Sequence, residues 1–168
     1  MKKINLLLVL CAPFFYFCSR KKIDIRPSVS QQIVGEWQNV YIRVEMPTAN
    51  NTNLLQILEI SEENSKQKLK LKPLHTSFNA NRTYQSEYKN YNGEIIYNPS
   101  GIWTIIGDTL VMMDTYPTRG KHCKYKIDME AGQVALRSKE DYDYDGKVDD
   151  FYYGLYRKVT DHPAVVVK

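Results

Sequence analysis

Apolar and polar residues alternate over short stretches along most of the chain, and turn-forming residues separate these stretches every eight to twelve positions or so. Alternation with a period of two is typical of strands that bury one face, whereas an amphipathic helix repeats about every 3.6 residues. No long stretch keeps the helical period. The pattern predicts an all-β domain, with helix confined to a turn near residues 28–32 that Ser28 or Ser30 could cap.

The same alternation places the individual strands, most of which are joined by connections short enough for hairpins. Asn92-Gly93 is a preferred sequence for a type I′ turn, and Ala131-Gly132 closes a later hairpin. Repeated hairpins of this kind indicate an antiparallel barrel or sandwich. The predicted strands are 33–45, 54–60, 66–78, 83–89, 94–97, 101–106, 109–116, 122–128, 133–138 and 151–159.

The N-terminus has the features of a secretory signal. Lys2 and Lys3 precede a mostly apolar run, 4–17, whose length suits a signal peptide and falls short of the roughly 20 residues that span a bilayer. The chain then divides into a signal peptide (1–17), Cys18 with a polar tether (18–30), one β-domain (31–160) and a C-terminal tail (161–168).

Cys18, at the end of this apolar run, resembles the cysteine that becomes the acylated first residue of a mature bacterial lipoprotein. The resemblance implies a membrane anchor at Cys18. Lipidation at Cys11, an uncleaved anchor and an ordinary cleaved signal are the alternatives. The basic residues that follow Cys18 differ from acidic surface-export signals, so we expect an outer-membrane lipoprotein in the cell envelope that faces the periplasm.

The charge of the chain argues against a nucleic-acid partner. The formal charge is +4, and it falls to +2 once Lys2 and Lys3 leave with the signal. Nucleic-acid binding needs a concentrated basic surface. The one lysine series, 66–72, alternates with leucines, and we interpret it as the solvated face of a strand.

An acidic loop near the C-terminus has the spacing of a calcium site. Residues 141–150 read DYDYDGKVDD, and alternate residues of a tight loop can direct their oxygens at one cation. The loop lacks the glutamate that completes an EF-hand, and it is similar to the D-x-D-x-D-G-x-x-D hairpins of integrin-type repeats. We predict that Ca²⁺ binds at this loop and stabilises it through Asp141, Asp143, Asp145, the Lys147 carbonyl and Asp149.

Gly35 and Trp37, on the first predicted strand, resemble the Gly-x-Trp signature of the lipocalin (calycin) superfamily. The resemblance implies an antiparallel up-and-down β-barrel of about 8–10 strands over residues 31–160. It also implies that the tryptophan plugs the closed end, with Arg157 from the last strand stacked on its indole. Residues 33–159 are further similar to lipocalin-like lipoproteins of the Bacteroidota. The alternative is that Trp37 is an ordinary core residue.

Three functions remain open. The first is a lipid-anchored, non-enzymatic module that binds a small apolar or amphipathic ligand, or an envelope protein. The second is a structural barrel filled by its own side chains, and the third is an unrecognised enzyme. Because His122 and Cys123 are neighbours on a predicted strand, they would face opposite sides, so we expect no enzyme. A cavity of at least about 300 Å³ would favour the binding module.

Overall fold

The computed structural model describes residues 27–159, so the predicted signal peptide, Cys18 and the tail 161–168 lie outside the described residues. The elements in chain order are α1 (Val29–Gln32), β1 (Gly35–Met46), the 3₁₀ helix η1 (Ala49–Asn51), β2 (Gln56–Ser61), α2 (Ser65–Lys68), β3 (His75–Phe78), β4 (Thr83–Lys89), β5 (Ile95–Tyr97), β6 (Ser100–Ile106), β7 (Thr109–Tyr116), β8 (His122–Glu130), β9 (Gln133–Glu140) and β10 (Asp150–Lys158). No helix in this range has the length and apolar character that crossing a bilayer requires.

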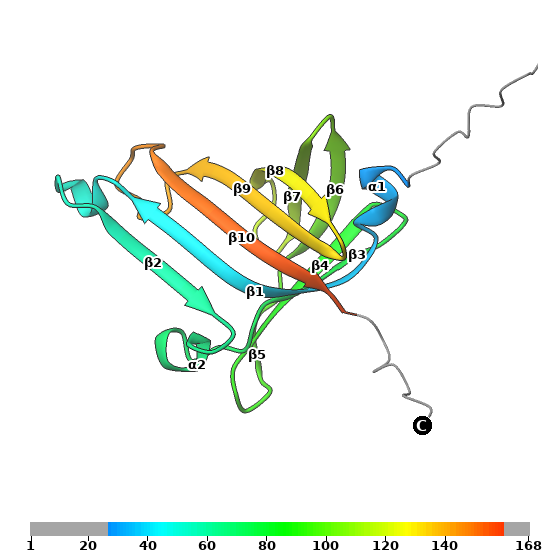
Figure 1. Ribbon diagram of the computed structural model, residues 1–168, viewed down its shortest axis with the longest axis horizontal. Coiled ribbons are helices and arrows are strands. Elements are labelled where there is room, and N and C mark those ends of the chain that lie inside the picture. The colour runs from blue at the N-terminus through cyan, green and yellow to red at the C-terminus, as the bar shows by residue number, and fades with distance from the viewer. Residues whose placement is uncertain (1–26, 160–168) are drawn as a thin grey trace, which may run out of the picture.

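Eight of the strands close into an antiparallel barrel (Figure 1). Each strand pairs with the next in the order β1, β3, β4, β6, β7, β8, β9 and β10, and β10 pairs back to β1. The strands β2 and β5 stand outside this ring, where β2 pairs with β1 and β5 with β4. The predicted all-β, up-and-down barrel is confirmed.

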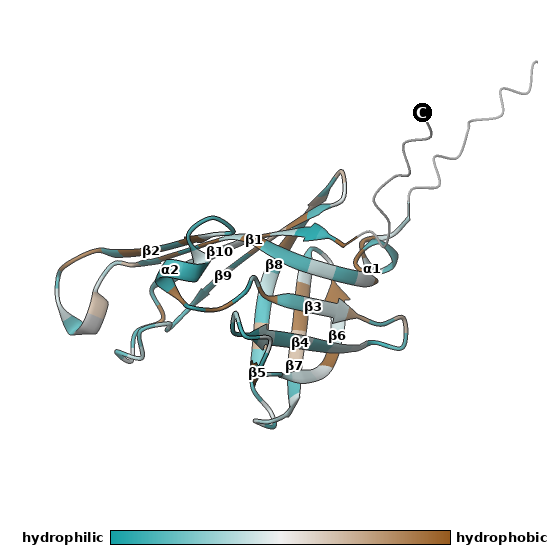
Figure 2. Cartoon of the chain, turned by 90° about the horizontal axis from the view of Figure 1, so that it is seen from below, coloured by the Kyte–Doolittle hydropathy of each residue, from teal (hydrophilic) through white to brown (hydrophobic). Residues whose placement is uncertain are grey.

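β1 is longer than the barrel wall and changes partner along its length. Its first part, Gly35 to Gln38, pairs with β3, and its second part, Tyr41 to Met46, pairs with β2. The register with β10 shifts between these parts, where the Asn39 amide donates to the carbonyls of Tyr41 and Leu155. The second half of β1, with β2 and β10, therefore forms an arm beyond the curved strands β3 to β7 (Figure 2).

The single strand predicted over residues 66–78 is wrong, because this segment forms the short helix α2, an irregular stretch and β3. Two residues interrupt the expected strand. Lys70 has a φ of 55°, which extended backbone cannot adopt, and Pro73 has no N–H to give to a strand ladder. The lysines accordingly do not form one face: Lys66 lies over the Tyr91 ring, and Lys68 donates to the Glu59 carbonyl at 2.8 Å.

The helix predicted near residues 28–32 is confirmed as α1. Ser28 occupies its N-cap, and the Gln31 side chain accepts a hydrogen bond from the Ser28 N–H at 2.9 Å. This contact is one half of a capping box.

Two hairpin turns differ in how they fit a type I′ turn, which requires a positive φ at both central residues. Ala131 and Gly132 meet this requirement, with φ values of 46° and 80°. The type I′ turn predicted at Asn92-Gly93 is wrong, because Asn92 has no positive φ and the β4–β5 connection is longer than predicted.

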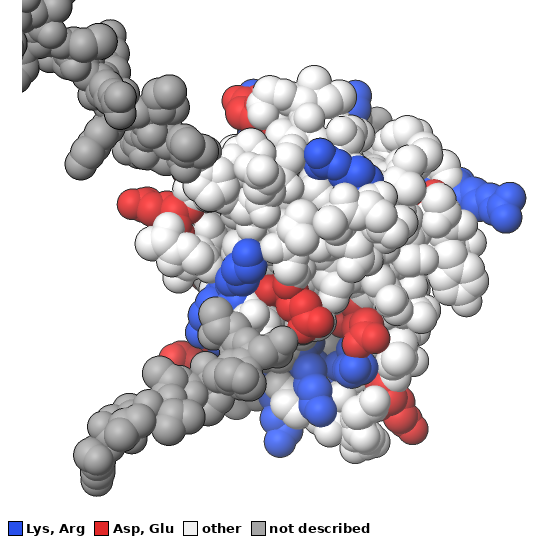
Figure 3. Space-filling view, turned by 90° about the vertical axis from the view of Figure 1, so that its right-hand side faces the viewer, with Lys and Arg blue, Asp and Glu red and all other residues white. Residues whose placement is uncertain are grey.

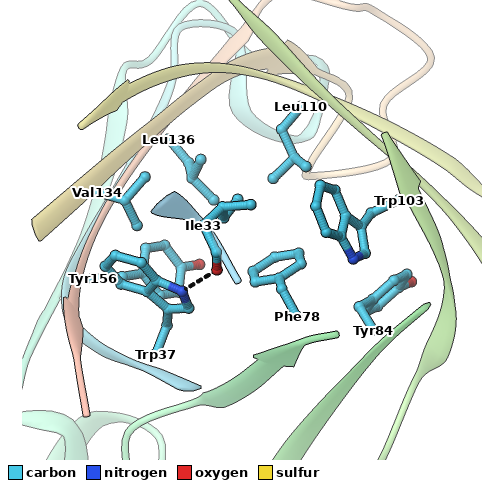
Figure 4. Packing of buried hydrophobic residues seen from close by; sticks show 9 residues of the cluster. All are labelled: Ile33, Trp37, Phe78, Tyr84, Trp103, Leu110, Val134, Leu136 and Tyr156. Carbon is cyan, nitrogen blue, oxygen red and sulfur yellow. Dashed lines mark hydrogen bonds between the residues drawn. The ribbon is translucent and has the colours of Figure 1, made fainter. Parts of the chain in front are cut away.

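The barrel core fills the end at which β1 begins, which we call the closed end (Figure 4). α1 leads directly into Ile33, which is fully buried, and the Ile33 carbonyl accepts the indole N–H of Trp37 at 2.6 Å. Phe78 meets Trp103 edge to face at 5.8 Å between ring centroids. The closed end is thus packed and its indole donor is satisfied. The buried cluster is Ile33, Trp37, Phe78, Tyr84, Trp103, Leu110, Val134, Leu136 and Tyr156.

The outside of the barrel is polar along most strands. β8 shows this most regularly, because its residues alternate between exposed and half-buried along its whole length. On the face shown in Figure 3, acidic and basic side chains lie near one another rather than in separate patches.

Candidate functional site

A cavity of about 250 Å³ occupies the barrel interior toward the other end, which we call the open end. At this end lie the last residues of β4, β7 and β9 and the first residues of β3, β8 and β10, as the antiparallel order requires. The cavity volume is below the range of roughly 300–1,000 Å³ usual for ligand pockets, so the criterion set from the sequence is not met. The cavity is lined by Ile33, Trp37, Ile42, Leu74, Thr76, Phe78, Ser86, Tyr88, Met112, Lys121, Tyr125, Val134, Leu136, Tyr142, Tyr152 and Tyr156.

The cavity has an apolar floor and walls that carry hydroxyl groups. The floor is the inner side of the closed-end core, including Trp37, Phe78 and Leu136. On the walls, the hydroxyls of Tyr152 and Tyr156 lie 2.7 Å apart. Thr76 and Ser86 form a second hydroxyl pair, at 2.8 Å on the adjacent strands β3 and β4. A bound molecule would therefore meet apolar surface at depth and polar groups along the sides.

The tyrosines of the cavity remain neutral at physiological pH. Burial raises the pKa of Tyr88 to about 12, and burial likewise raises the pKa of Tyr142 to about 12. The pKa values of Tyr125, Tyr152 and Tyr156 are also raised, again because burial disfavours the phenolate. These side chains act as hydrogen-bonding groups without charge.

A small side cleft of about 40 Å³ adjoins the cavity, where β1 leaves β3. Ile42, Leu74 and Tyr88 line both the cavity and the cleft. The segment between α2 and β3 closes this gap in the wall, because Leu74 accepts a hydrogen bond from the Asn39 N–H and Lys72 donates one to the Lys89 carbonyl. The open end is thus bounded partly by irregular chain rather than by paired strands.

The acidic loop lies between β9 and β10, at the mouth of the cavity, and contributes Tyr142 to its lining. Carboxylate oxygens of Asp141, Asp143 and Asp150 lie within 4.8 Å of one another. Asp150 is almost fully buried and accepts the Tyr142 N–H at 2.6 Å. Asp141 accepts the N–H groups of Asp145 and Gly146. Backbone amides therefore already hold the turn.

The other predicted ligands lie against a second loop. Asp145 Oδ2 is 3.2 Å and Asp149 Oδ2 is 3.1 Å from the Thr48 hydroxyl. Lys147 Nζ lies 3.4 Å from Asp145 Oδ2. Burial opposes the charge of Asp145, but hydrogen bonds from Lys147 and Thr48 outweigh it and lower the pKa of this carboxyl. These contacts tie the acidic loop to the chain that follows β1.

The three clustered carboxylates fit a hard divalent cation, since such ions prefer oxygen ligands. Asp141 and Asp143 belong to the predicted set, whereas Asp150 takes part in place of Asp149. The reason is strand alternation: Asp150 is the first residue of β10 and points inward, so its neighbour Asp149 points away. Lys147 meets Asp145 through its N–H, which donates to Asp145 Oδ1 at 2.9 Å, and through its ammonium group, whereas the predicted ligand was its carbonyl. Calcium binding itself stays a prediction.

The predicted stack of Arg157 on Trp37 is wrong by one residue. Trp37 lies opposite Lys158 in the β1–β10 pair, and Arg157 lies opposite Gln38. Successive side chains point to opposite faces of a sheet, so the Lys158 ammonium lies over the indole, 5.5 Å from its centroid. Arg157 points outward, where its guanidinium pairs with Glu62 at 2.9 Å.

Gly35 is required beside this stack. Its φ is 128°, and a Cβ at this position would lie 2.9 Å from Lys158 Cε. The Lys158 ammonium in turn donates to the Gln32 carbonyl at 3.2 Å. The glycine therefore gives room to the side chain that covers Trp37, and together they close the barrel next to α1.

His122 and His75 lie outside the cavity, whereas Cys123 lies on the inner face of β8 and its side chain contacts that of Tyr125, which lines the cavity. His122 is exposed on β8, whereas its neighbour Cys123 is half-buried, in agreement with their alternation along the strand. Burial raises the pKa of the Cys123 thiol, which disfavours the reactive thiolate. His75 Nε2 lies 3.3 Å from Glu36 Oε2 on the outside of β1 and β3.

The comparisons with known proteins are weak. No protein-family model matches the chain, and no curated protein matches it. Among solved structures, a lipocalin-like protein from Bacteroides uniformis is 13% identical with a TM-score of 0.44, over 76% of this chain and 99% of that one. An uncharacterized protein from Bacteroides eggerthii is 10% identical with a TM-score of 0.46, over 75% and 98%. Sequence identities and TM-scores this low assign no function to this chain. The evidence for the closed barrel is the pairing of its own strands.

Two site features were not predicted from the sequence. Lys121 at the cavity mouth lies in a turn segment that has no motif. Thr48 lies far from the acidic loop along the chain, so its contacts with Asp145 and Asp149 depend on the path of the chain after β1. By contrast, alternation along β10 could have placed Asp150 on the inner face.

Proposed function

We propose that this chain is a non-enzymatic binding module whose open-end cavity accepts one small amphipathic molecule. The observation that carries the proposal is the division of the cavity into an apolar floor and hydroxyl-bearing walls. A few placed polar groups on a mostly apolar surface are typical of small-molecule sites. The volume of about 250 Å³ equals the liquid volume of about eight waters, at roughly 30 Å³ each, which limits the ligand to a compact molecule.

The contrast with the closed end supports binding over a wholly filled barrel. At the closed end, Trp37, Phe78 and Trp103 pack against one another and against Ile33. The tyrosines of the open end are equally large, yet a cavity remains because the Tyr152 ring lies along its own strand over Gly154, where its hydroxyl bonds to that of Tyr156 in the closed-end core.

The sequence adds a proposed location. We propose that acylation at Cys18 anchors the module to the outer membrane on its periplasmic side, with the residues between Cys18 and α1 as the tether. A lipid-bearing cysteine would be held at the membrane, where small amphipathic molecules concentrate. Mass spectrometry of the N-terminal peptide from the native membrane tests this proposal, because acylation adds the mass of the lipid to a peptide that begins at Cys18.

The binding proposal is tested by filling the cavity. Met112 lines the cavity, whereas its neighbour Met113 lies on the opposite face of β7. The full chain and its Met112→Trp and Met113→Trp variants would be purified from their own membrane and examined by native mass spectrometry. We expect a small bound mass on the wild type and on Met113→Trp that is absent from Met112→Trp. A bound mass that survives Met112→Trp would contradict the cavity as the site.

A structural module is the second candidate, and the observation in its favour is the cavity volume, which is below the usual range for ligand pockets. In that case none of the three proteins carries a small mass, and Met112→Trp raises the melting temperature by filling empty space. A protein of the cell envelope that copurifies equally with all three proteins would instead indicate that the outer surface is the functional one.

A further inference from the structure

Lys121 is the one charged residue among the described residues that line the cavity. It precedes β8 in the β7–β8 connection, at the open end. Its carbonyl accepts the Asp114 N–H at 2.9 Å, which continues the ladder between β7 and β8 and fixes the backbone of Lys121 at the mouth. The position of this cation is therefore set by the strand pair, although its side chain is exposed.

Lys121 also has no partner of opposite charge. Within residues 27–159 its side chain takes part in no ion pair and no hydrogen bond. Two other cations of the barrel do have such a partner: Lys89 pairs with Glu87 at 2.5 Å, and Lys126 pairs with Asp108 at 2.6 Å. The buried carboxylate of the β7–β8 region, Asp114, is already bonded to the Tyr84 hydroxyl.

The cavity supplies nothing to offset this charge. Its other lining residues are apolar, or they carry hydroxyl groups that do not ionise near neutral pH. An ion pair at the mouth of such a cavity is partly shielded from water and is stronger than one on an open surface. A ligand that places a negative charge at Lys121 would gain this interaction, and one lysine matches one charge.

Given the proposed function, we propose that the ligand is a small organic carboxylate. Its carboxylate pairs with Lys121 at the mouth, and its compact apolar or aromatic body enters the cavity alongside Met112 and Tyr152, toward the floor at Leu136. The volume of about 250 Å³ gives the body of such a molecule room for roughly eight non-hydrogen atoms, judged from the space that water occupies.

The test compares two probes of the same shape, 4-ethylbenzoate and 4-ethylbenzamide, which differ in charge. The full chain, labelled with ¹³C at the methionine methyl groups, would be titrated with each probe and followed by NMR. The Met112 methyl reports on the cavity, and the Met113 methyl, on the outer face of β7, is the internal control. We expect the benzoate to bind about two to five times more tightly than the benzamide, as an exposed charge pair allows.

Two variants assign this preference to one residue. Lys121→Gln removes the cation at the mouth, and Lys124→Gln makes the same charge change on an exposed residue of β8. We expect Lys121→Gln to bind both probes equally and Lys124→Gln to keep the preference for benzoate. Equal binding of both probes to the wild type, or an unchanged preference in Lys121→Gln, would overturn the carboxylate assignment and leave the cavity as a binding site. Failure of both probes to shift Met112 in any variant would overturn the proposed function itself.

Discussion

The two ends of this barrel are built from the same kinds of residue but packed in different ways. At the closed end, aromatic rings contact one another, α1 covers them, and polar atoms such as the Trp37 indole N–H are bonded inward. At the open end, tyrosines line a cavity and bond along its walls, and the connections there carry the acidic loop. The comparison indicates that the closed end stabilises the fold and that the open end is available for binding.

The difference has a simple origin in strand pairing. At the closed end β1 pairs with both β3 and β10, so the ring of strands is complete. Beyond Gln38, β1 leaves β3 and pairs with β2, and irregular chain before β3 fills the gap. Side chains near this gap have fewer neighbours to pack against, and a cavity remains.

The largest expected effect is on the free energy of unfolding, when one aromatic residue from each end is replaced by alanine. Trp37→Ala removes the plug of the closed end and should lower the free energy of unfolding by about 3–5 kcal/mol, as buried aromatic truncations do. Tyr142→Ala at the mouth should lower it by only about 1 kcal/mol, since that ring is partly exposed and bounds a cavity. Denaturant titrations of both variants measure this. Equal losses would show that the two ends share the stability.

The next largest expected effect is the dependence of the melting temperature on calcium binding at the acidic loop. If calcium binds the carboxylates of Asp141, Asp143 and Asp150, added Ca²⁺ should raise the melting temperature of the wild type, and a chelator should reverse the rise. Asp150→Asn should abolish this dependence and also destabilise the apo chain by about 1–2 kcal/mol, because the bonds that it accepts lose their charge. Asp149→Asn, which changes a carboxylate on the Thr48 side, is the control and should keep the dependence. Identical melting with and without chelator would rule out a calcium-stabilised loop.

Alkaline pH should weaken the open end through its tyrosines. The pKa of Tyr88 is about 12 in the folded chain, against about 10 for an exposed tyrosine. Between these two values the unfolded chain releases the phenolic proton and the folded chain keeps it. The free energy of unfolding is therefore at its full value below pH 10 and falls as pH rises toward 12. Denaturant titrations across this window should show the fall, and Tyr88→Phe should reduce its slope. A slope unchanged by Tyr88→Phe would assign the fall to other groups.

The smallest expected effect is the difference in stability lost when either of two adjacent cations at the closed end is replaced. Lys158→Met removes the charge over Trp37 and should cost about 0.5–2 kcal/mol, the range of cation–π contacts. Arg157→Met removes an exposed pair with Glu62 and should cost about 0–1 kcal/mol. The Trp37 emission spectrum provides a second readout, since only Lys158→Met changes the charge beside the indole. A larger loss in Arg157→Met would contradict the assignment of the stack to Lys158.

Much of the fold could be predicted from local pattern, because each strand buries one face. The observed bounds of β4 and β7 are those predicted, and Ser28 caps α1. The error over residues 66–78 arose because alternating lysine and leucine imitate a strand, while Lys70 adopts a positive φ that the pattern does not indicate. Alternation fixes which side a residue faces only if the strand exists.

The site was less predictable because it depends on contacts between distant segments. Gly35 and Trp37 were found from their spacing, but choosing between Arg157 and Lys158 required the register of β10 against β1. Cavity volume depends on how tyrosines orient across the barrel, and no local pattern encodes this. The position of Lys121 at the cavity mouth could not be predicted locally, because strands from both halves of the chain form the cavity.

The most direct test of the proposed binding site is an experimental electron-density map of the full chain purified from its native source. We predict density for one compact molecule between Met112 and Tyr152, with its polar end toward Lys121, and a closed end around Trp37 that contains only protein. A cavity that holds water alone, or side chains that have collapsed to fill it, would contradict the claim that the open end is a binding site.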